Sequence, residues 1–111
     1  MPNYRPDLPA LFRALGDPTR LAVVERLSRG PAPVGALAAR FDMALPSFTQ
    51  HLALLEEAGL VRSRKNGRTR TCALAPGALK PAQDWLARRR ELWERRLDRL
   101  DDYLLRLKEG K

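Results

Sequence analysis

A short stretch of the chain concentrates its positive charge. The formal net charge is +8, residues 1–59 are neutral, and residues 60–80 carry six basic side chains and no acidic one. Five of these cations fall within residues 62–70 and repel one another, which a polyanionic partner would relieve. They are Arg62, Arg64, Lys65, Arg68 and Arg70. Basic residues also solubilise protein surfaces, but this clustering favours contact with a nucleic-acid backbone.

A second group of side chains, just before the cationic stretch, has the chemistry to hydrogen-bond base edges. Pro46 opens a predicted helix in which Phe48, Leu52 and Leu55 form one apolar face. The opposite face carries short polar side chains, and its first turn has no carboxylate that would repel phosphate. The candidate DNA contacts on this helix are Pro46, Ser47, Thr49, Gln50 and His51.

The elements before this helix are predicted from apolar spacing and from capping residues. A first helix covers Leu8–Leu15 and ends at Gly16. Asp17 is a suitable cap for a second helix, which Gly30-Pro31 ends, and a third helix follows Pro33. Three short helices therefore precede the polar helix and are expected to form the core beneath it.

The cationic stretch itself is predicted to form a β-hairpin. Two short segments, Leu60–Lys65 and Arg68–Leu74, are separated by Asn66-Gly67, a dipeptide that favours tight hairpin turns. We expect arginine to dominate one side of this hairpin and its tip, with apolar residues facing the core on the other. The apolar residues are Val61, Cys72 and Leu74. A charged hairpin directly after a short-polar helix forms a wing.

One long helix is predicted from Pro81 to about Lys108, with a coiled-coil-like seam of apolar residues. Such a helix spans roughly 40 Å, whereas the remaining residues form a globule of only about 25 Å. The seam therefore needs a second copy of the chain, although it could instead pack on its own first helix while its end frays. The expected dimer contacts are Leu8, Leu11, Phe12, Trp85, Leu86, Trp93, Leu97, Leu100, Leu104 and Leu107.

Three segments resemble the ArsR/SmtB family of bacterial repressors. Phe12–Leu21 is similar to the opening signature of the family, and Leu45–Val61 to its recognition helix and the exit into its wing. This resemblance covers about residues 8–75, and Trp85–Leu107 is similar to a branch with a long C-terminal helix. The resemblance implies a mainly α winged helix-turn-helix fold: about five helices and a two-stranded wing, dimerised by the first and last helices.

The resemblance also implies a function. A protein of this family binds an operator and represses transcription, often of its own operon, and a symmetric dimer suits an inverted-repeat operator. Ser47, Thr49 and Gln50 would contact bases and backbone, with His51 near the phosphates. The wing cations would hold the DNA backbone or the minor groove.

Metal sensing of the kind known in the family is not expected. The cysteine positions of its metal sensors correspond here to Pro33, Gly35 and Ala38, and residues 81–111 contain no histidine. One cysteine, Cys72, and one histidine, His51, cannot supply the three or four ligands that a tight transition-metal site needs. We therefore expect no metal or other cofactor, and whether a small-molecule effector exists stays open.

Several other classes are disfavoured. No constellation of catalytic residues is present, and no apolar run is long enough to span a membrane. The single cysteine suits a reducing cytoplasm, where a nucleoid-associated protein would work. We expect one domain over residues 1–111, with its core in residues 8–75.

Two alternative functions stay open. The apolar seam could dock another protein in a winged helix that has lost DNA binding. Alternatively, Cys72 could gate a repressor by oxidation, since Arg68 and Arg70 would lower the pKa of an exposed thiol.

Overall fold

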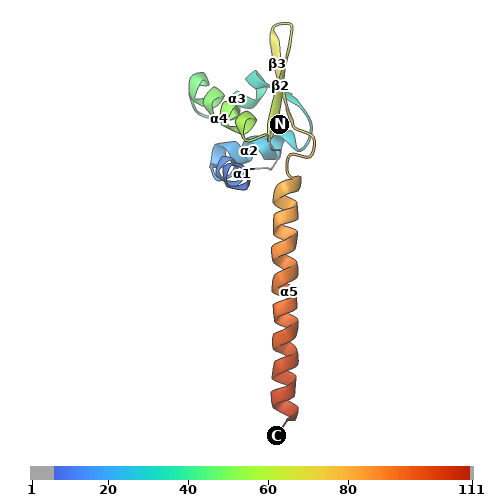
Figure 1. Ribbon diagram of the computed structural model, residues 1–111. Helices are drawn as coiled ribbons and strands as arrows, with labels where there is room; N and C mark the ends of the chain where they lie inside the picture. The colour runs from blue at the N-terminus through green and yellow to red at the C-terminus, as the bar shows by residue number, and fades with distance from the viewer. Residues whose placement is uncertain (1–6, 111) are drawn as a thin grey trace. The chain divides into compact units, whose positions relative to one another are not determined.

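A computed structural model of the protein describes residues 7–110, and the chain divides into two compact units, one ending at Pro81 and one beginning at Ala82. The first unit contains four helices and three strands (Figure 1). They are α1 (Leu8–Leu15), α2 (Pro18–Leu27), β1 (Ala32–Pro33), α3 (Val34–Ala38), α4 (Leu45–Glu57), β2 (Val61–Asn66) and β3 (Thr69–Leu74). A single helix, α5 (Lys80–Glu109), makes up most of the second unit. Within residues 7–110, no helix has the length and apolar character that crossing a membrane requires.

Two of the helices, α1 and α2, begin directly after a capping aspartate, and the second of these caps, Asp17, is the one that the sequence predicts. The Oδ1 atom of Asp7 accepts a hydrogen bond from the N–H of Ala10 at 3.1 Å, and Oδ2 of Asp17 accepts one from the N–H of Arg20 at 3.0 Å. Each satisfies a backbone donor that the first turn of a helix leaves without a partner. The mainly α winged helix-turn-helix fold with five helices is confirmed, and α3 is only five residues long.

The wing belongs to a three-stranded antiparallel sheet in the order β1-β3-β2, not to a two-stranded hairpin alone. Ala32 pairs with Cys72 and Pro33 with Thr71. A strand of two residues has no alternating pattern that could reveal it in a sequence. Pro33 has no N–H to donate and is tolerated because β1 lies at the edge of the sheet.

The hairpin turns one residue later than the sequence predicts. Asn66 is still in β2 and pairs with Thr69, so the turn consists of Gly67 and Arg68. Gly67 has φ +67°, and no described residue other than glycine has a positive φ. A tight turn with a positive φ only at its first central residue fits type II′ and needs a glycine there. The expectation of Asn66-Gly67 as the turn pair was therefore wrong.

The core of the first unit lies between the helices and the inner face of the sheet. Phe48 of α4 is fully buried, and its ring stacks on that of Phe41 with 5.5 Å between the ring centres. The largest fully buried side chains are Val23, Leu37, Phe48, Leu55, Leu60 and Cys72. Among the described residues, no buried side-chain nitrogen or oxygen lacks a hydrogen-bond partner. This core holds α4 and the wing on one scaffold.

Gly59 sets the direction in which the chain leaves α4 for the wing. Its φ is +80°, a left-handed conformation that favours glycine. The N–H of Gly59 donates to the carbonyl of Glu56 at 3.0 Å, and the N–H of Leu60 donates to that of Leu55 at 2.9 Å. These two bonds form a Schellman motif, which ends the helix and delivers Leu60 into the core.

We expect Gly59→Ala to destabilise the protein by about 1–2 kcal/mol, because a side chain is strained at this φ. An ideal Cβ at Gly59 meets no atom within 4 Å, so strain of the backbone and not a clash is the cause. Chemical denaturation measures the change in the free energy of unfolding. Gly35→Ala is the matched control, since that glycine has no positive φ and its Cβ also meets nothing. Equal stability of the two variants would contradict the role of Gly59.

Candidate nucleic-acid interface

The face of α4 opposite the core is polar and exposed. Phe48, Leu52 and Leu55 are buried, as the helical spacing predicts, so the other side of the helix faces solvent. The structure places Pro46, Ser47, Thr49 and Gln50 on this exposed side. These side chains are short, so a binding partner could approach the helix backbone closely.

The N-terminus of α4 carries no capping side chain. The cap position is Ala44, and the first turn contains a proline and no acidic residue. Backbone N–H groups at an uncapped N-terminus, with the positive end of the helix dipole, attract phosphate. This end of α4 therefore suits contact with an anionic backbone.

Thr49 has a more restricted chemistry than its sequence position suggested. Its Oγ1 donates to the carbonyl of Pro46 at 2.9 Å, one turn earlier in the same helix. The hydroxyl has only one hydrogen, so towards a ligand it can act as an acceptor beside its methyl group. Ser47 and Gln50 are the exposed side chains of this face that can both donate and accept.

His51 connects α4 to α2 and is only partly exposed. The Nη1 atom of Arg20 donates to its Nδ1 at 3.0 Å, and Oδ2 of Asp17 lies 3.7 Å from the same nitrogen. Because Arg20 has only donors, Nδ1 acts as the acceptor and the ring proton is assigned to Nε2. The contact places His51 beside the start of α2.

Arg20 is a positioning residue that the sequence analysis missed. Its Nε donates to the carbonyl of Ala14 at 2.8 Å and its Nη2 to that of Arg13 at 3.3 Å. One guanidinium therefore joins the end of α1, the start of α2 and the middle of α4. Its planar fork of donors allows this, and a lysine could not reproduce it. Only the fold brings Arg20 and His51 together, so no local sequence pattern could have revealed the pair.

Asp17 is also electrostatically coupled to this group. The hydrogen bond from the backbone N–H of Arg20 has the largest effect and lowers the pKa of Asp17 below its ordinary value of 3.8; burial opposes it, and the charge of Arg20, with that of His51 when the ring is protonated, lowers the pKa by smaller amounts. The folded state therefore favours the charged carboxylate over the neutral acid.

The wing carries cations on both faces, whereas the sequence predicts that arginine dominates one side of the hairpin and its tip. In the register, Arg62 and Arg64 alternate with Val61, Ser63 and Lys65 along β2. Side chains of a strand point alternately to opposite faces, so Lys65 shares the face of the buried Val61. Arg70 lies opposite Lys65 on that same face. Arg62 and Arg64 therefore lie on one face of the wing, and Lys65 and Arg70 lie on the other. Arg68 lies in the turn.

The face with Lys65 forms an open hollow of about 440 Å³, lined by Ser63, Lys65, Arg68 and Arg70. Lys65 and Arg70 are direct cross-strand partners, and like charges in that position destabilise a sheet. An anion in the hollow would remove this repulsion. Arg62, Arg64, Lys65, Arg68 and Arg70 are all exposed, as a backbone-contacting wing requires.

A second polar contact braces the wing against α4. The Oγ of Ser63 donates to Oε1 of Glu56 at 2.6 Å, and Nε of Arg70 donates to Oγ of Ser63 at 3.0 Å. Nη2 of Arg70 lies 3.8 Å from Oε1 of Glu56. Arg70 is therefore partly engaged in holding the wing, and Glu56 and Ser63 are site residues that sequence analysis did not select.

Cys72 lies in β3, and its side chain is fully buried. Burial raises the pKa of its thiol above the ordinary value of 9.0, and the nearby carboxylate of Glu56 acts in the same direction, while Arg70 opposes both. A thiol that is protonated and inaccessible reacts slowly with oxidants. The geometry therefore removes the support for a redox switch at Cys72.

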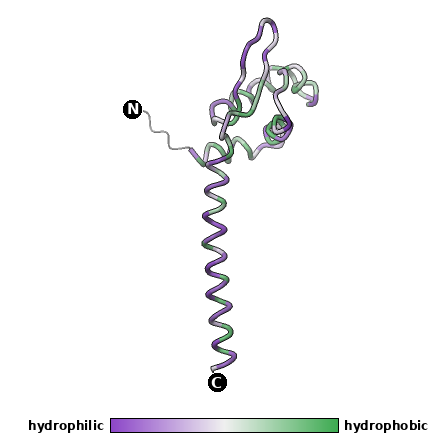
Figure 2. The backbone as a smooth tube through the Cα atoms, turned by 90° about the vertical axis from the view of Figure 1, so that its right-hand side faces the viewer, coloured by the Kyte–Doolittle hydropathy of each residue, from purple (hydrophilic) through white to green (hydrophobic). Residues whose placement is uncertain are grey.

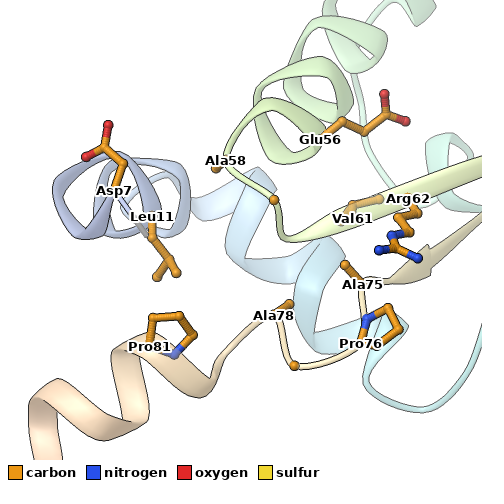
Figure 3. A pocket seen from close by; sticks show the side chains of 12 residues that line it. Asp7, Leu11, Glu56, Ala58, Val61, Arg62, Ala75, Pro76, Ala78 and Pro81 are labelled. Carbon is orange, nitrogen blue, oxygen red and sulfur yellow. The ribbon is translucent and has the colours of Figure 1, made fainter. Parts of the chain in front are cut away.

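A pocket of about 360 Å³ lies between α1, the end of α4 and the segment after β3 (Figure 3). In Figure 3, Leu11 and Pro81 face each other, whereas the carboxylates of Asp7 and Glu56 point away from them. The centre of the pocket is thus apolar, and it holds no group of side chains suited to catalysis.

The residues expected at a dimer interface differ in exposure. Leu11 is only 4% exposed in its own unit and has little surface left for a partner, whereas Phe12 is 39% exposed and Leu8 is half-buried. On α5 all the expected contacts are exposed, and hydrophobic positions recur among hydrophilic ones along the helix (Figure 2). They are Trp85, Leu86, Trp93, Leu97, Leu100, Leu104 and Leu107. Within residues 7–110, no three His, Cys, Asp or Glu side chains gather as metal ligands would.

Known proteins that resemble this chain are helix-turn-helix regulators of transcription. Residues 15–64 match a family described as a helix-turn-helix domain. The chain is 44% identical over 80 residues to the HTH-type transcriptional regulator Rv2034 of Mycobacterium tuberculosis, which covers 71% of this chain and 73% of that protein. A crystal structure of an ArsR family transcriptional regulator is 52% identical, with a TM-score of 0.76, over 85% of this chain and 97% of its own.

The chain belongs to the ArsR family of transcriptional regulators. A further structure, a homodimeric winged helix-turn-helix DNA-binding domain from Mycobacterium bovis described as a possible ArsR-family regulator, is 25% identical with a TM-score of 0.60. It covers 77% of this chain and 81% of its own. This ArsR protein is therefore a DNA-binding helix-turn-helix regulator of transcription, and its relatives are regulators, not enzymes.

We expect the contribution of Asp17 to the free energy of unfolding of the ArsR protein to depend on pH. A carboxyl whose pKa is lowered on folding stabilises the native state above its ordinary pKa, here 3.8, and loses that effect as the pH falls through the lower, folded pKa. Asp17→Asn keeps a cap acceptor but no charge, so it should be less stable than wild type at pH 6. The difference should shrink below pH 3.8 in denaturation curves. A constant difference at all pH values would argue against the electrostatic coupling.

Cys72 should be unreactive in the folded ArsR protein. A thiol-specific colorimetric reagent should label it at least a hundred-fold more slowly than the unfolded chain in denaturant, because the native thiol is buried and protonated. Operator affinity should be the same before and after exposure to peroxide. Fast labelling of the native protein, or a loss of affinity that Cys72→Ser prevents, would restore the redox hypothesis.

Proposed function

We propose that this protein is a homodimeric repressor that binds an inverted-repeat operator, with α4 in the major groove and the wing on the adjacent backbone or minor groove. One observation carries the proposal: α4 exposes short polar side chains beside a first turn without an acidic residue, and Glu56 at its other end braces a cationic wing that has no acidic residue. Both parts face solvent, and both rest on the same buried core.

Base recognition is assigned to α4. Gln50 is exposed and can form paired hydrogen bonds with the edge of an adenine, and Ser47 can donate or accept. Thr49 offers a methyl group to thymine and an acceptor to the exocyclic amine of adenine or cytosine. Pro46 and the uncapped first turn lie next to these residues and would approach a phosphate. His51, held by Arg20, positions the helix and offers Nε2 as a donor towards the backbone.

Backbone contact is assigned to the wing. Arg62 and Arg64 lie on one face, Arg68 in the turn, and Lys65 with Arg70 on the other face. Cations on both faces allow the hairpin to insert between two phosphate strands, as a wing in a minor groove would. Neutralising each phosphate releases counterions, so these contacts supply affinity that does not depend on sequence.

The dimer is assigned to α5 and to the exposed part of α1. Two copies related by a two-fold axis would present two α4 helices to successive major grooves of a palindromic site. Of the residues expected on α1, Phe12 and Leu8 retain the surface to take part. The regulator is proposed to act without the metal sites known in its family, at its own or a neighbouring operon, in the cytoplasm on the nucleoid.

A second function, docking of another protein on a winged helix without DNA binding, would use the same exposed apolar residues of α5. Sedimentation distinguishes the two. A dimer at low micromolar concentration has its apolar residues covered by a second copy, whereas a monomer would leave them available and favour the docking function.

Operator binding can be tested with fragments selected from genomic DNA, followed by titrations of the best fragment and of random DNA at two salt concentrations. Gln50→Ala should weaken binding to the selected fragment by roughly 1–3 kcal/mol and change binding to random DNA little. Arg64→Ala should weaken both alike and reduce the slope of log affinity against log salt by about one.

Arg99→Ala is the matched control for Arg64→Ala, because it removes the same charge from α5, outside the proposed DNA contacts. It should leave both affinities and the salt slope unchanged. Binding that does not depend on salt would refute the assignment of backbone contact to the wing. Equal effects of Gln50→Ala on both DNAs would refute the assignment of base recognition to Gln50.

A further inference from the structure

Among residues 7–110, Glu56 is the only acidic residue that forms a hydrogen bond or an ion pair with the hairpin of β2 and β3. Its carboxylate accepts a hydrogen bond from the hydroxyl of Ser63, and the same hydroxyl accepts one from Nε of Arg70. Ser63 and Arg70 also line the hollow of the wing, together with Lys65 and Arg68. One internal carboxylate is therefore attached to the edge of a cationic hollow.

Glu56 acts as the internal counter-charge of this hollow. Three positive charges line it, those of Lys65, Arg68 and Arg70, and no acidic residue lines it. Lys65 and Arg70 are cross-strand partners, so their repulsion acts against the hairpin. The Oε1 atom of Glu56 lies 3.8 Å from Nη2 of Arg70 and offsets part of this repulsion. In the free protein the carboxylate thus has the role that a bound phosphate would have in a complex.

The same contact occupies donors that a phosphate would use. A guanidinium binds phosphate most strongly through two parallel N–H bonds from one of its edges. The Nε of Arg70 donates to Ser63, and Nη2 on the same edge faces Glu56. The hydroxyl of Ser63 has a single hydrogen and donates it to Glu56. A phosphate that binds this edge must displace Glu56 or lie close to its negative charge, and both lower the affinity.

This restraint distinguishes Arg70 from the arginines on the other face of the wing. Arg62 and Arg64 form no ion pair with any carboxylate among the described residues. The side chain of Arg70 is 60% exposed, so DNA can reach it, but its contact with Glu56 has to be given up first. The cations of the wing are therefore not equivalent in what they contribute to binding.

We propose that Glu56 competes with DNA phosphate for Arg70, so that the wing hollow binds the backbone by exchanging an internal carboxylate for a phosphate. The inference rests on the DNA binding of the proposed function and adds a residue of α4 that limits the affinity of the wing for any DNA. The carboxylate stabilises the free wing and weakens the complex. Removing its charge should therefore have opposite effects on folding and on binding.

Glu56→Gln tests the exchange, because it removes the charge and keeps an oxygen that can accept the hydrogen bond from Ser63. We expect it to tighten binding to the selected fragment and to random DNA alike, by about two- to fivefold at low salt. The slope of log affinity against log salt should become steeper by up to about one. The same variant should unfold at a slightly lower denaturant concentration than wild type. A contact with a purely structural role would weaken both folding and binding.

A double-mutant cycle with Arg70→Ala tests whether the effect passes through Arg70. In that background Glu56→Gln should change DNA affinity little, because no guanidinium is left for the carboxylate to hold. Arg70→Ala alone should weaken binding less than Arg64→Ala does, and in the Glu56→Gln background it should weaken binding about as much. Equal tightening by Glu56→Gln with and without Arg70 would overturn the proposal, since it would show only a general repulsion between the carboxylate and DNA.

Glu57→Gln is the matched control. It makes the same charge change one residue further along α4, where the side chain is exposed and forms no ion pair with another described residue. Its effect on DNA affinity should be smaller than that of Glu56→Gln and the same with and without Arg70. Tightening as large as that of Glu56→Gln would also overturn the proposal.

The outcomes separate this inference from the proposed function. Wild-type protein that binds DNA with a steep salt dependence, while Glu56→Gln binds no more tightly, refutes the exchange and leaves the repressor in place. Wild-type protein that binds no DNA at any salt concentration refutes both. Tighter binding of Glu56→Gln that disappears with Arg70→Ala, together with lower stability of the free variant, supports the exchange.

Discussion

The burial of one face of α4 is the constraint on which the rest of the binding surface depends. Phe48, Leu52 and Leu55 enter the core and fix the rotation of the helix about its own axis. In a helix of 3.6 residues per turn, this rotation leaves Ser47 and Gln50 on the solvent side. The left-handed Gly59 then turns the chain directly into β2, so the position of the wing follows from the end of the same helix.

Two groups of polar contacts fix the positions of α4 and the wing within the first unit. Arg20 joins α1, α2 and α4 through one planar group, and Glu56 holds the wing through Ser63 and Arg70. Neither contact is deeply buried, so each contributes modestly to stability. Their effect is geometric, because a helix and a hairpin that meet one duplex must keep a fixed relation to each other.

The proposed dimer gives the exposed residues of α5 a thermodynamic role. Fully burying a leucine or tryptophan side chain stabilises an assembly by about 1.5–3 kcal/mol, and a domain this small has limited core of its own. Pairing also links DNA binding to protein concentration, because only the dimer presents two recognition helices.

The sequence by itself determined the elements of this protein: five helices, a wing, the buried face of α4 and the exposed polar and cationic side chains. These follow from local periodicity and from caps such as Asp17, which act within a few residues. The tertiary structure decided the third strand, the turn at Gly67-Arg68, the division of cations between both faces of the wing, and the contacts of Arg20 with His51 and of Glu56 with Ser63. The register of a hairpin depends on the whole sheet, and Arg20 and His51 are 31 residues apart, so packing of the complete core and no local pattern brings them together.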